Sequence, residues 1–260
     1  MSISILESSL NLRIDRKNHK LVHHSDYVLT SDVAKNQLEY EYNADIYCNV
    51  EYMECQDEEY LFEFSKNGYK RITALFEDNR GILCYVKKEI QITNVEHRMK
   101  SPHLLHFQII KDNRLLNIIV FRILVSDGSK ADFYNRKLQF DSVMQYIDFI
   151  GTSDLIITGD WNHANVRKVY DPVNHNQYIF NYQYICSELE RRGLKMGIKI
   201  NPNIPPQKSG LHSYKGFLAI DHIAIGTDLE FISTPKYSSY DLNAPIGTPD
   251  HAFLFSEISF

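Results

Sequence analysis

The chain has 260 residues, of which 43% are hydrophobic and 23% charged, and its net charge is −5. This composition is that of a globular protein large enough to bury a core without disulfides, and it excludes a disordered chain. The acidic balance argues against binding nucleic acid through overall charge, although a local basic rim beside a metal ion could still hold a phosphate.

Runs of apolar and β-branched residues predict strands at residues 3–12, 44–53, 70–76, 81–87, 89–94, 104–110, 115–125, 155–158, 217–226 and 251–260. Apolar residues at steps of three and four predict helices at residues 28–42, 58–65, 131–150 and 180–192. Helices recur between strands and no linker divides the chain, so we expect one α/β domain over residues 1–260. The long loops at 161–177 and 199–215 are expected to border a site.

The four cysteines have no CxxC spacing, which favours free thiols. The N-terminus lacks a basic segment followed by a long apolar stretch. The most apolar run, 115–125, is too short to span a bilayer and contains Arg122. We therefore expect a cytoplasmic protein without a membrane span.

Polar residues stand repeatedly at the ends of the predicted strands. The set comprises Asn11, Glu51, Asp160, Asn162, Asp221, Asp250 and His251. A polar side chain beside a buried strand is costly unless it is paired or bound to a metal. So many of them, with one histidine among them, predict a shared site.

Several motifs in this set resemble those of the DNase I-like (endonuclease/exonuclease/phosphatase) superfamily. GDWN (159–162) resembles its GD-hydrophobe-N motif, IDHI (220–223) its strand-borne Asp motif, and PDH (249–251) its C-terminal Ser-Asp-His. The family's metal-ligand strand, Gly-led strand and Arg-x-x-Gln helix resemble ADIYCNVE (44–51), GILCYV (81–86) and NRKLQFDSVMQYI (135–147). The order is that of the family and covers essentially the whole chain. The resemblance implies an α/β fold, a DNase I-like two-sheet β-sandwich flanked by helices.

The resemblance also implies a role for each residue. Glu51, helped by Asn11 and Asp250, would hold Mg²⁺, for which Mn²⁺ could substitute, since these are hard oxygen ligands. His251 would move protons or steady a phosphoryl oxygen, and Asp221 would fix its tautomer. Asp160 would orient or deprotonate the attacking water, and Asn162 would donate hydrogen bonds to the developing charge.

The chain departs from the family pattern at three positions. Arg122 stands where the family usually has His or Tyr, Val50 replaces a Gln, and Pro249 replaces a Ser. Arg is permanently cationic, so Arg122 could hold a phosphate but could not donate a proton. We expect Arg122 to act as a phosphate clamp in the catalytic site.

The resemblance implies a metal-dependent phosphodiester hydrolase, and we expect a nuclease acting on DNA or RNA. The pair Arg167 and Lys168, just after GDWN, would touch the substrate phosphates. Two alternatives stay open: a phosphatase or phosphodiesterase of a small or lipid substrate, of the inositol phosphate or sphingomyelin type, and a binding protein on a retired scaffold. Protein partners are not indicated.

Simpler interpretations exist for single residues. Glu51 could be a solvated strand end, Asn11 a turn residue, and Arg122 an ion-pairing residue without a phosphate contact. His23, His24 and His163 lack the spacing of a zinc motif.

Overall fold

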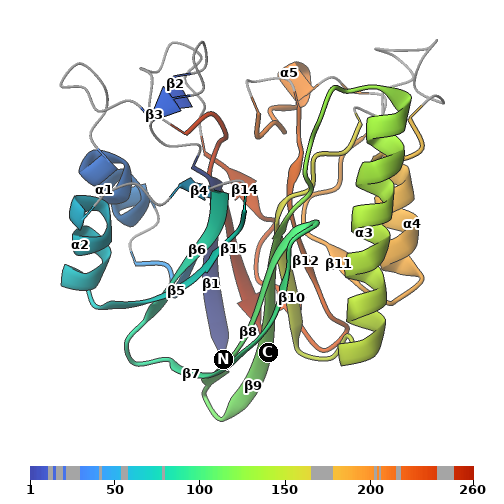
Figure 1. The fold of residues 1–260 in the computed structure, drawn as a ribbon. Helices are drawn as coiled ribbons and strands as arrows, with labels where there is room; N and C mark the ends of the chain where they lie inside the picture. Colours follow the sequence, from blue (N-terminus) through green and yellow to red (C-terminus); the bar gives the residue numbers. More distant parts are fainter. Residues whose placement is uncertain are drawn as a thin grey trace.

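In the computed structural model, two mixed β-sheets pack face to face and helices cover the outer side of each (Figure 1). The structure describes residues 1–10, 14–15, 20–21, 30–40, 43–53, 58–77, 80–164, 178–201, 204, 206–214, 218–238 and 249–260. None of the helices in these ranges is both long enough and apolar enough to cross a membrane.

The first sheet has the strand order β13 (Glu230–Phe231), β15 (Leu254–Ser259), β1 (Ser2–Ser9), β4 (Ile46–Met53), β6 (Arg80–Lys87), β5 (Tyr69–Leu75), and β14 (Lys236–Tyr237) also pairs with β15. The second has the order β11 (Lys195–Met196), β12 (Asp221–Ile225), β10 (Leu155–Asp160), β9 (Arg114–Arg122), β8 (His103–Lys111), β7 (Gln91–Met99). A small pair, β2 (Ile14–Asp15) and β3 (Lys20–Leu21), lies apart from both.

Each sheet has one parallel pair at its centre, with antiparallel strands on either side. The parallel pairs are β1 with β4 and β9 with β10. The carboxyl ends of the two strands in each pair therefore lie at the same edge of their sheet. Strands β12 and β15 run the opposite way beside them, so these two strands begin at that edge.

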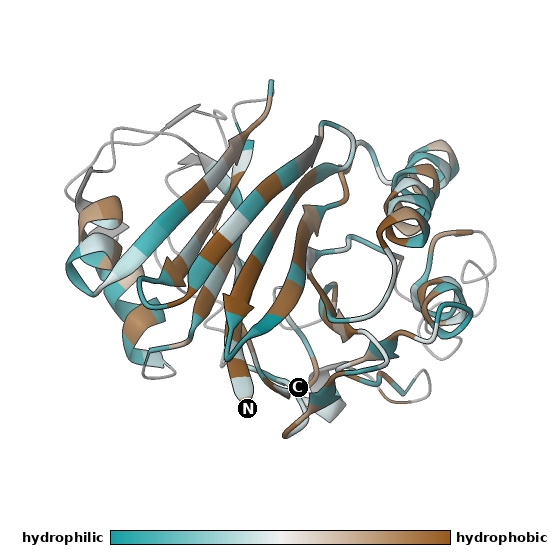
Figure 2. Ribbon diagram, turned by 90° about the horizontal axis from the view of Figure 1, so that it is seen from below, coloured by the Kyte–Doolittle hydropathy of each residue, from teal (hydrophilic) through white to brown (hydrophobic). Residues whose placement is uncertain are grey.

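The core lies in three layers. Between the sheets pack Ile, Val and Leu side chains from strands of both sheets. The helices α1 (Thr30–Tyr40) and α2 (Glu58–Lys66) cover the first sheet with an aromatic cluster that includes Tyr60 and Phe64. The helices α3 (Lys130–Ile150) and α4 (Tyr182–Glu190) cover the second sheet around Trp161 and Phe140. Figure 2 shows the alternation of polar and apolar residues along the strands that permits this two-sided packing.

The principal predicted helices and strands are confirmed, with shifted ends. The strand predicted at 115–125 ends at Arg122, because Leu124 turns away to bond the side-chain amide of Gln139 on α3. The strand predicted at 217–226 begins at Asp221, since the Ser213 hydroxyl accepts the backbone N–H groups of Ile220 and Asp221. The last strand begins at Leu254 rather than at 251. The stretch predicted as the loop 199–215 contains the short helix α5 (Pro206–Ser209).

Candidate active site

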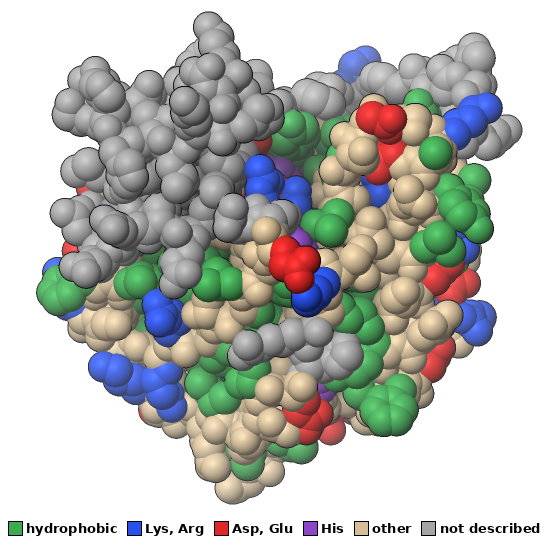
Figure 3. All heavy atoms as spheres, in the orientation of Figure 1, with side chains coloured by type: hydrophobic (Ala, Val, Ile, Leu, Met, Phe, Trp, Pro, Cys, Tyr) green, Lys and Arg blue, Asp and Glu red, His purple; other side chains and the backbone are tan. Residues whose placement is uncertain are grey.

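The strand ends of both sheets meet around one pocket of about 590 Å³. Its lining includes six residues that were predicted from the sequence to share a site: Glu51, Arg122, Asp160, Asn162, Asp250 and His251. Figure 3 shows Lys or Arg side chains and a His side chain close together in the upper middle of the view.

The strand faces that pack between the two sheets carry apolar side chains along most of their length and polar side chains at the end beside the pocket. On β9 the inter-sheet residues are Leu116, Ile118 and Val120, and the next residue on that face is Arg122. On β10 and β12 the alternation leads to Asp160 and Asp221, which are register partners. The alternating pattern of the strands therefore places the charged residues on the face between the sheets.

Glu51 reaches this face through a β-bulge. The pairing of β4 with β6 shifts register between Asn49 and Tyr52, and Glu51 has a positive φ of 53°. A bulge turns a side chain that strict alternation would point to the other face. The carboxylate of Glu51 then forms ion pairs with Arg122 and Arg80 and accepts a hydrogen bond from the Ser9 hydroxyl at 3.2 Å.

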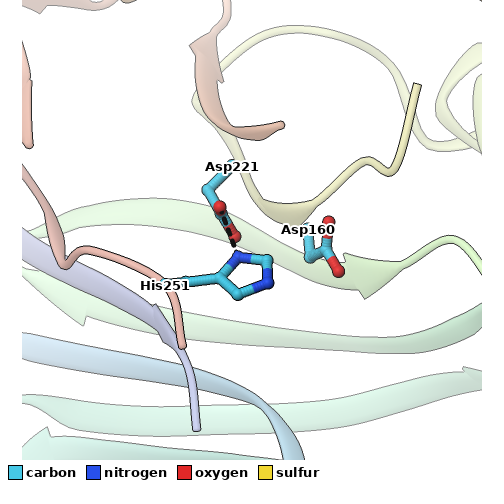
Figure 4. A group of neighbouring side chains, drawn as sticks. All are labelled: Asp160, Asp221 and His251. Atoms are coloured by element: carbon cyan, nitrogen blue, oxygen red, sulfur yellow. Dashed lines mark hydrogen bonds and ion pairs between the residues drawn. The ribbon is translucent and has the colours of Figure 1, made fainter. Parts of the chain in front are cut away.

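His251 is held by Asp221. The imidazole Nδ1 lies 2.6 Å from the Asp221 carboxylate, whereas Asp250 lies 3.9 Å from Nε2. Figure 4 shows the bond to Asp221 on one side of the ring and Asp160 beyond the other ring nitrogen. Potential ligand atoms of Asp160, Asp221 and His251 all lie within 4.8 Å of one another. The hydrogen bond fixes Nδ1 and leaves Nε2 on the side of the pocket.

The charges of this group shift its pKa values in a way that suits acid–base work. Burial raises the pKa of Asp160, and the neighbouring Asp221 raises it further, to about 7. Burial alone would lower the pKa of His251, but the charge of Asp221 and the hydrogen bond that Nδ1 donates to it outweigh this and raise the pKa to about 10. Near neutral pH the site therefore combines an imidazolium with a carboxyl group poised to lose its proton.

The GDWN motif holds Asp160 in place. Gly159 has a φ of 139°, and a Cβ there would lie 1.9 Å from the Phe121 carbonyl oxygen, so only glycine fits. Trp161 is fully buried in the core under α3. The side-chain amide of Asn162 donates to the Ile123 carbonyl at 3.0 Å and to the Asp160 carboxylate at 2.5 Å. In this arrangement the amide of Asn162 donates within the protein and positions Asp160, whereas the sequence predicted a donor to the developing charge.

The donor set in the pocket fits a hard divalent cation. Glu51 and Asp250 offer carboxylate oxygens, and none of the described residues that line the pocket is a thiol. Arg122 and Arg80 both contact Glu51. Burial would raise the pKa of the Glu51 carboxyl, but the charges of the two arginines outweigh it and lower this pKa. A cation bound at Glu51 would share its carboxylate with these two guanidinium groups.

Three of the predicted site residues lie outside the described residues: Asn11, Arg167 and Lys168. Conversely, Ser9 and Arg80 both contact Glu51 and were not predicted from the sequence. Ser9 could have been found, because it shares the inward face of β1 with Ile3 and Ile5. Arg80 could not, since its contact depends on how β6 pairs with the bulged β4.

Glu7 is a further buried carboxyl beneath the site. It lies on the same inward face of β1, is completely buried, and its two carboxylate oxygens have no hydrogen-bond partner among the described residues. Burial raises its pKa well above the usual range, and the charges of Asp221 and Asp160 add to this. Burial and these neighbouring charges therefore favour the neutral form of Glu7 in the folded chain.

Replacing Glu7 by Gln is expected to stabilise the fold increasingly as pH rises. A raised folded-state pKa means that Glu7 binds its proton more tightly in the folded chain than in the unfolded chain, where the pKa of a Glu side chain is about 4.3. The contribution of Glu7 to wild-type stability is thus largest below that pH and is lost as pH rises through the folded-state pKa, whereas Gln cannot ionise. Urea unfolding at pH 5 and pH 8 measures the difference.

The exposed Glu257 on β15 provides the control, because Glu257→Gln should leave stability unchanged at both pH values. An equal effect of Glu7→Gln at pH 5 and pH 8 would show that Glu7 is ionised in the fold.

This architecture, two mixed sheets with a polar pocket at the shared strand ends, is the DNase I-like two-sheet fold that the motifs predicted. No protein-family sequence profile matches the chain, and no curated protein sequence matches it. Solved structures do. The chain is similar to the human Nocturnin catalytic domain with bound sulfate, at 17% identity and a TM-score of 0.67, covering 100% of this chain and 94% of that one.

Two further solved structures span nearly the same length. TDP2 of D. rerio, complexed with a single-strand DNA product, is 13% identical with a TM-score of 0.62, covering 100% of this chain and 99% of that one. ANGEL2, a 2′,3′-cyclic phosphatase in complex with adenosine-2′,3′-vanadate, is 10% identical with a TM-score of 0.68, and the match covers 99% of this chain and 95% of that one. At these identities the likeness establishes the fold and leaves activity to be argued from the site.

Proposed function

We propose that this chain is a divalent-metal-dependent phosphodiester hydrolase that acts on nucleic acid. One observation carries the proposal: Glu51, Asp160 and the Asp221–His251 pair come from four places in the sequence and meet at one pocket. Each buried charged group lowers the stability of the fold, so a protein that had lost its catalytic activity is not expected to retain this many of them. The similar TDP2 structure holds a DNA product and the similar ANGEL2 structure a nucleoside vanadate, which supports a nucleic-acid substrate.

The residues divide the reaction between them. Asp160, with its pKa near 7, accepts a proton from the attacking water, and Asn162 holds it in position. His251, kept protonated by Asp221, donates through Nε2 to an oxygen of the phosphoryl group. Arg122 stabilises charge on the phosphoryl oxygens. Glu51 and Asp250, with Asn11 as the predicted third ligand, would hold the metal. When bound, the metal would polarise the phosphoryl group. Mg²⁺ is the proposed ion, and Mn²⁺ could substitute for it.

Several broader assignments belong to the same proposal. We treat residues 1–260 as one phosphoesterase domain, because β1 and β15, from the two ends of the chain, pair in one sheet. Arg167 and Lys168 follow the GDWN motif and are proposed to contact substrate phosphates. We also propose a cytoplasmic location, since Cys48, Cys84 and Cys186 form no disulfide.

A substrate panel tests the proposal. Single-stranded DNA, double-stranded DNA and RNA oligonucleotides are incubated with the protein and Mg²⁺ beside an inositol phosphate and sphingomyelin. We expect hydrolysis of at least one nucleic acid. Turnover confined to the inositol phosphate or sphingomyelin would replace the nuclease with the small-substrate alternative, and no turnover of any of them would favour the binding protein.

Replacing Arg122 by Ala is expected to lower kcat/KM by about 10- to 100-fold, mainly by raising KM. Arg122 lines the pocket, its side chain is 11% exposed, and its Nε lies 3.8 Å from the Asp160 carboxylate. A guanidinium there can hold phosphoryl oxygens in both the ground state and the transition state. Steady-state kinetics across a range of substrate concentrations provide the measurement.

Arg80→Ala is the matched control, because Arg80 also pairs with Glu51 but does not line the pocket. A loss for Arg80→Ala as large as that for Arg122→Ala would mean that Arg122 acts only by neutralising Glu51.

A further inference from the structure

The pocket extends beyond the charged residues to an aromatic wall. Its lining includes Phe133, near the start of α3, and Tyr178, just before α4, and the centroids of these two rings lie 4.3 Å apart with an angle of 55° between their planes. Both side chains are only partly buried, so they offer ring surface to the pocket. A volume of about 590 Å³ is that of a small-molecule site and far exceeds the space that a phosphate group alone requires.

The aromatic wall is rigidly supported. The guanidinium of Arg136 lies 4.2 Å from the centroid of the Phe133 ring. Arg136 is itself fixed, because its Nε donates to Asp132 at 3.1 Å and its Nη1 donates to the backbone carbonyl of Asn162 at 2.8 Å. Asp132 in turn accepts the backbone N–H groups of Ser126 and Gly128. Arg136 is 6% exposed, and its Nε, Nη1 and Nη2 each donate a hydrogen bond to Asp132 or Asn162, so its guanidinium is held in place beside Phe133.

This support connects the wall to the catalytic residues. The Asn162 carbonyl that Arg136 holds belongs to the residue whose side chain positions Asp160. The Phe133 ring is therefore linked to Asp160 through one cation–π contact and two hydrogen bonds. The pocket thus places an aromatic surface and a set of charged side chains in one lining, which suits a ligand that carries both a flat ring and a phosphate.

We propose that Phe133 and Tyr178 form a nucleobase-stacking subsite next to the scissile phosphate, which commits the pocket to nucleotide substrates. This inference rests on the proposed function and specifies the substrate contact of the same site. A base stacked on aromatic rings contributes about 5- to 150-fold to affinity and requires no particular base, because every base has a π-face. The subsite thus recognises a nucleotide without reading its sequence.

Binding of two phosphate compounds that differ only in the base tests the subsite independently of turnover. Calorimetry in the presence of Mg²⁺ compares adenosine 5′-monophosphate with ribose 5-phosphate, for the wild type and for Phe133→Leu, Tyr178→Leu and the double variant. We expect the wild type to bind the nucleotide about 5- to 150-fold more tightly than the sugar phosphate, and the double variant to lose most of this preference. Phe133→Trp, which keeps an aromatic ring, should retain it.

Tyr134→Leu is the control, since Tyr134 is the neighbour of Phe133 on α3, is 52% exposed and does not line the pocket. It should keep the wild-type preference. Equal affinities of the wild type for the two compounds, or an equal loss for both compounds in the double variant, would overturn the subsite. Failure of the proposed function is a separate result, because it would appear as absent hydrolysis while the preference for the nucleotide remained.

Discussion

Replacing His251 by Gln is expected to lower kcat/KM by about 10²- to 10⁴-fold, because a general acid–base residue contributes on this scale. The structure holds the imidazole Nδ1 on Asp221 and leaves Nε2 on the pocket side, in the protonated form that can donate to the substrate. Gln can still donate to the buried Asp221 carboxylate, so the fold should survive. In the wild type, activity should fall as pH approaches about 10, where His251 loses its proton, and the variant should lack this alkaline limb.

His106→Gln is the matched control, because His106 is also buried but contacts Tyr146 at 2.8 Å and does not line the pocket. Its kcat/KM should stay near the wild-type value. A His251→Gln enzyme that keeps both its rate and the alkaline limb would remove His251 from the mechanism.

Replacing Asp160 by Asn is expected to cost a comparable factor, about 10²- to 10⁴-fold in kcat, with a smaller change in KM. Asn has the same shape and can keep the contact with Asn162 but cannot accept a proton from water. The pKa of Asp160 is raised to about 7, so the wild-type rate should increase as pH rises through about 7 and the carboxyl ionises. The pH profile of kcat, measured between about pH 5.5 and 9, should lose this acid limb in the variant.

Asp45→Asn serves for comparison, since Asp45 is a partly buried carboxylate that pairs with Lys87 and Lys111 just before β4, at the end opposite Glu51. It should affect stability and leave the pH profile in place. An acid limb that persists unchanged in Asp160→Asn would assign the base to another group.

Much of the fold could be predicted because local patterns and packing agree. The helix at 131–150 has apolar residues on one face, and the structure buries Phe140, Val143, Met144 and Ile147 against the second sheet. The strands β13 and β14, which each pair with β15, were missed because a strand of two residues shows no alternation of polar and apolar positions. The end of β9 was placed too late because Leu124 is apolar and yet leaves the sheet to bond Gln139.

The site was predictable as a set of positions, and less so as a set of contacts. Strand-end polar residues and motif order brought Glu51, Asp160, Asp221 and His251 together correctly. The contacts that depend on the bulge at Glu51 could not be predicted, because its positive φ and its two arginine partners follow from the pairing of β4 with β6. Asn162 shows the same limit, since its spacing identifies the motif but its amide is engaged by Asp160.

In the proposed function, this pocket hydrolyses phosphodiesters with a divalent metal held at Glu51. The most direct measurement is the hydrolysis rate of an oligonucleotide as Mg²⁺ is titrated, for the wild type and Glu51→Gln, with excess EDTA as the blank and circular dichroism to confirm the fold. We expect no hydrolysis in EDTA, a saturable rise with Mg²⁺ in the wild type, and a folded variant that needs much more Mg²⁺, since Gln is a weaker ligand than a carboxylate. Full hydrolysis in EDTA, or the same Mg²⁺ dependence in Glu51→Gln, would contradict the account.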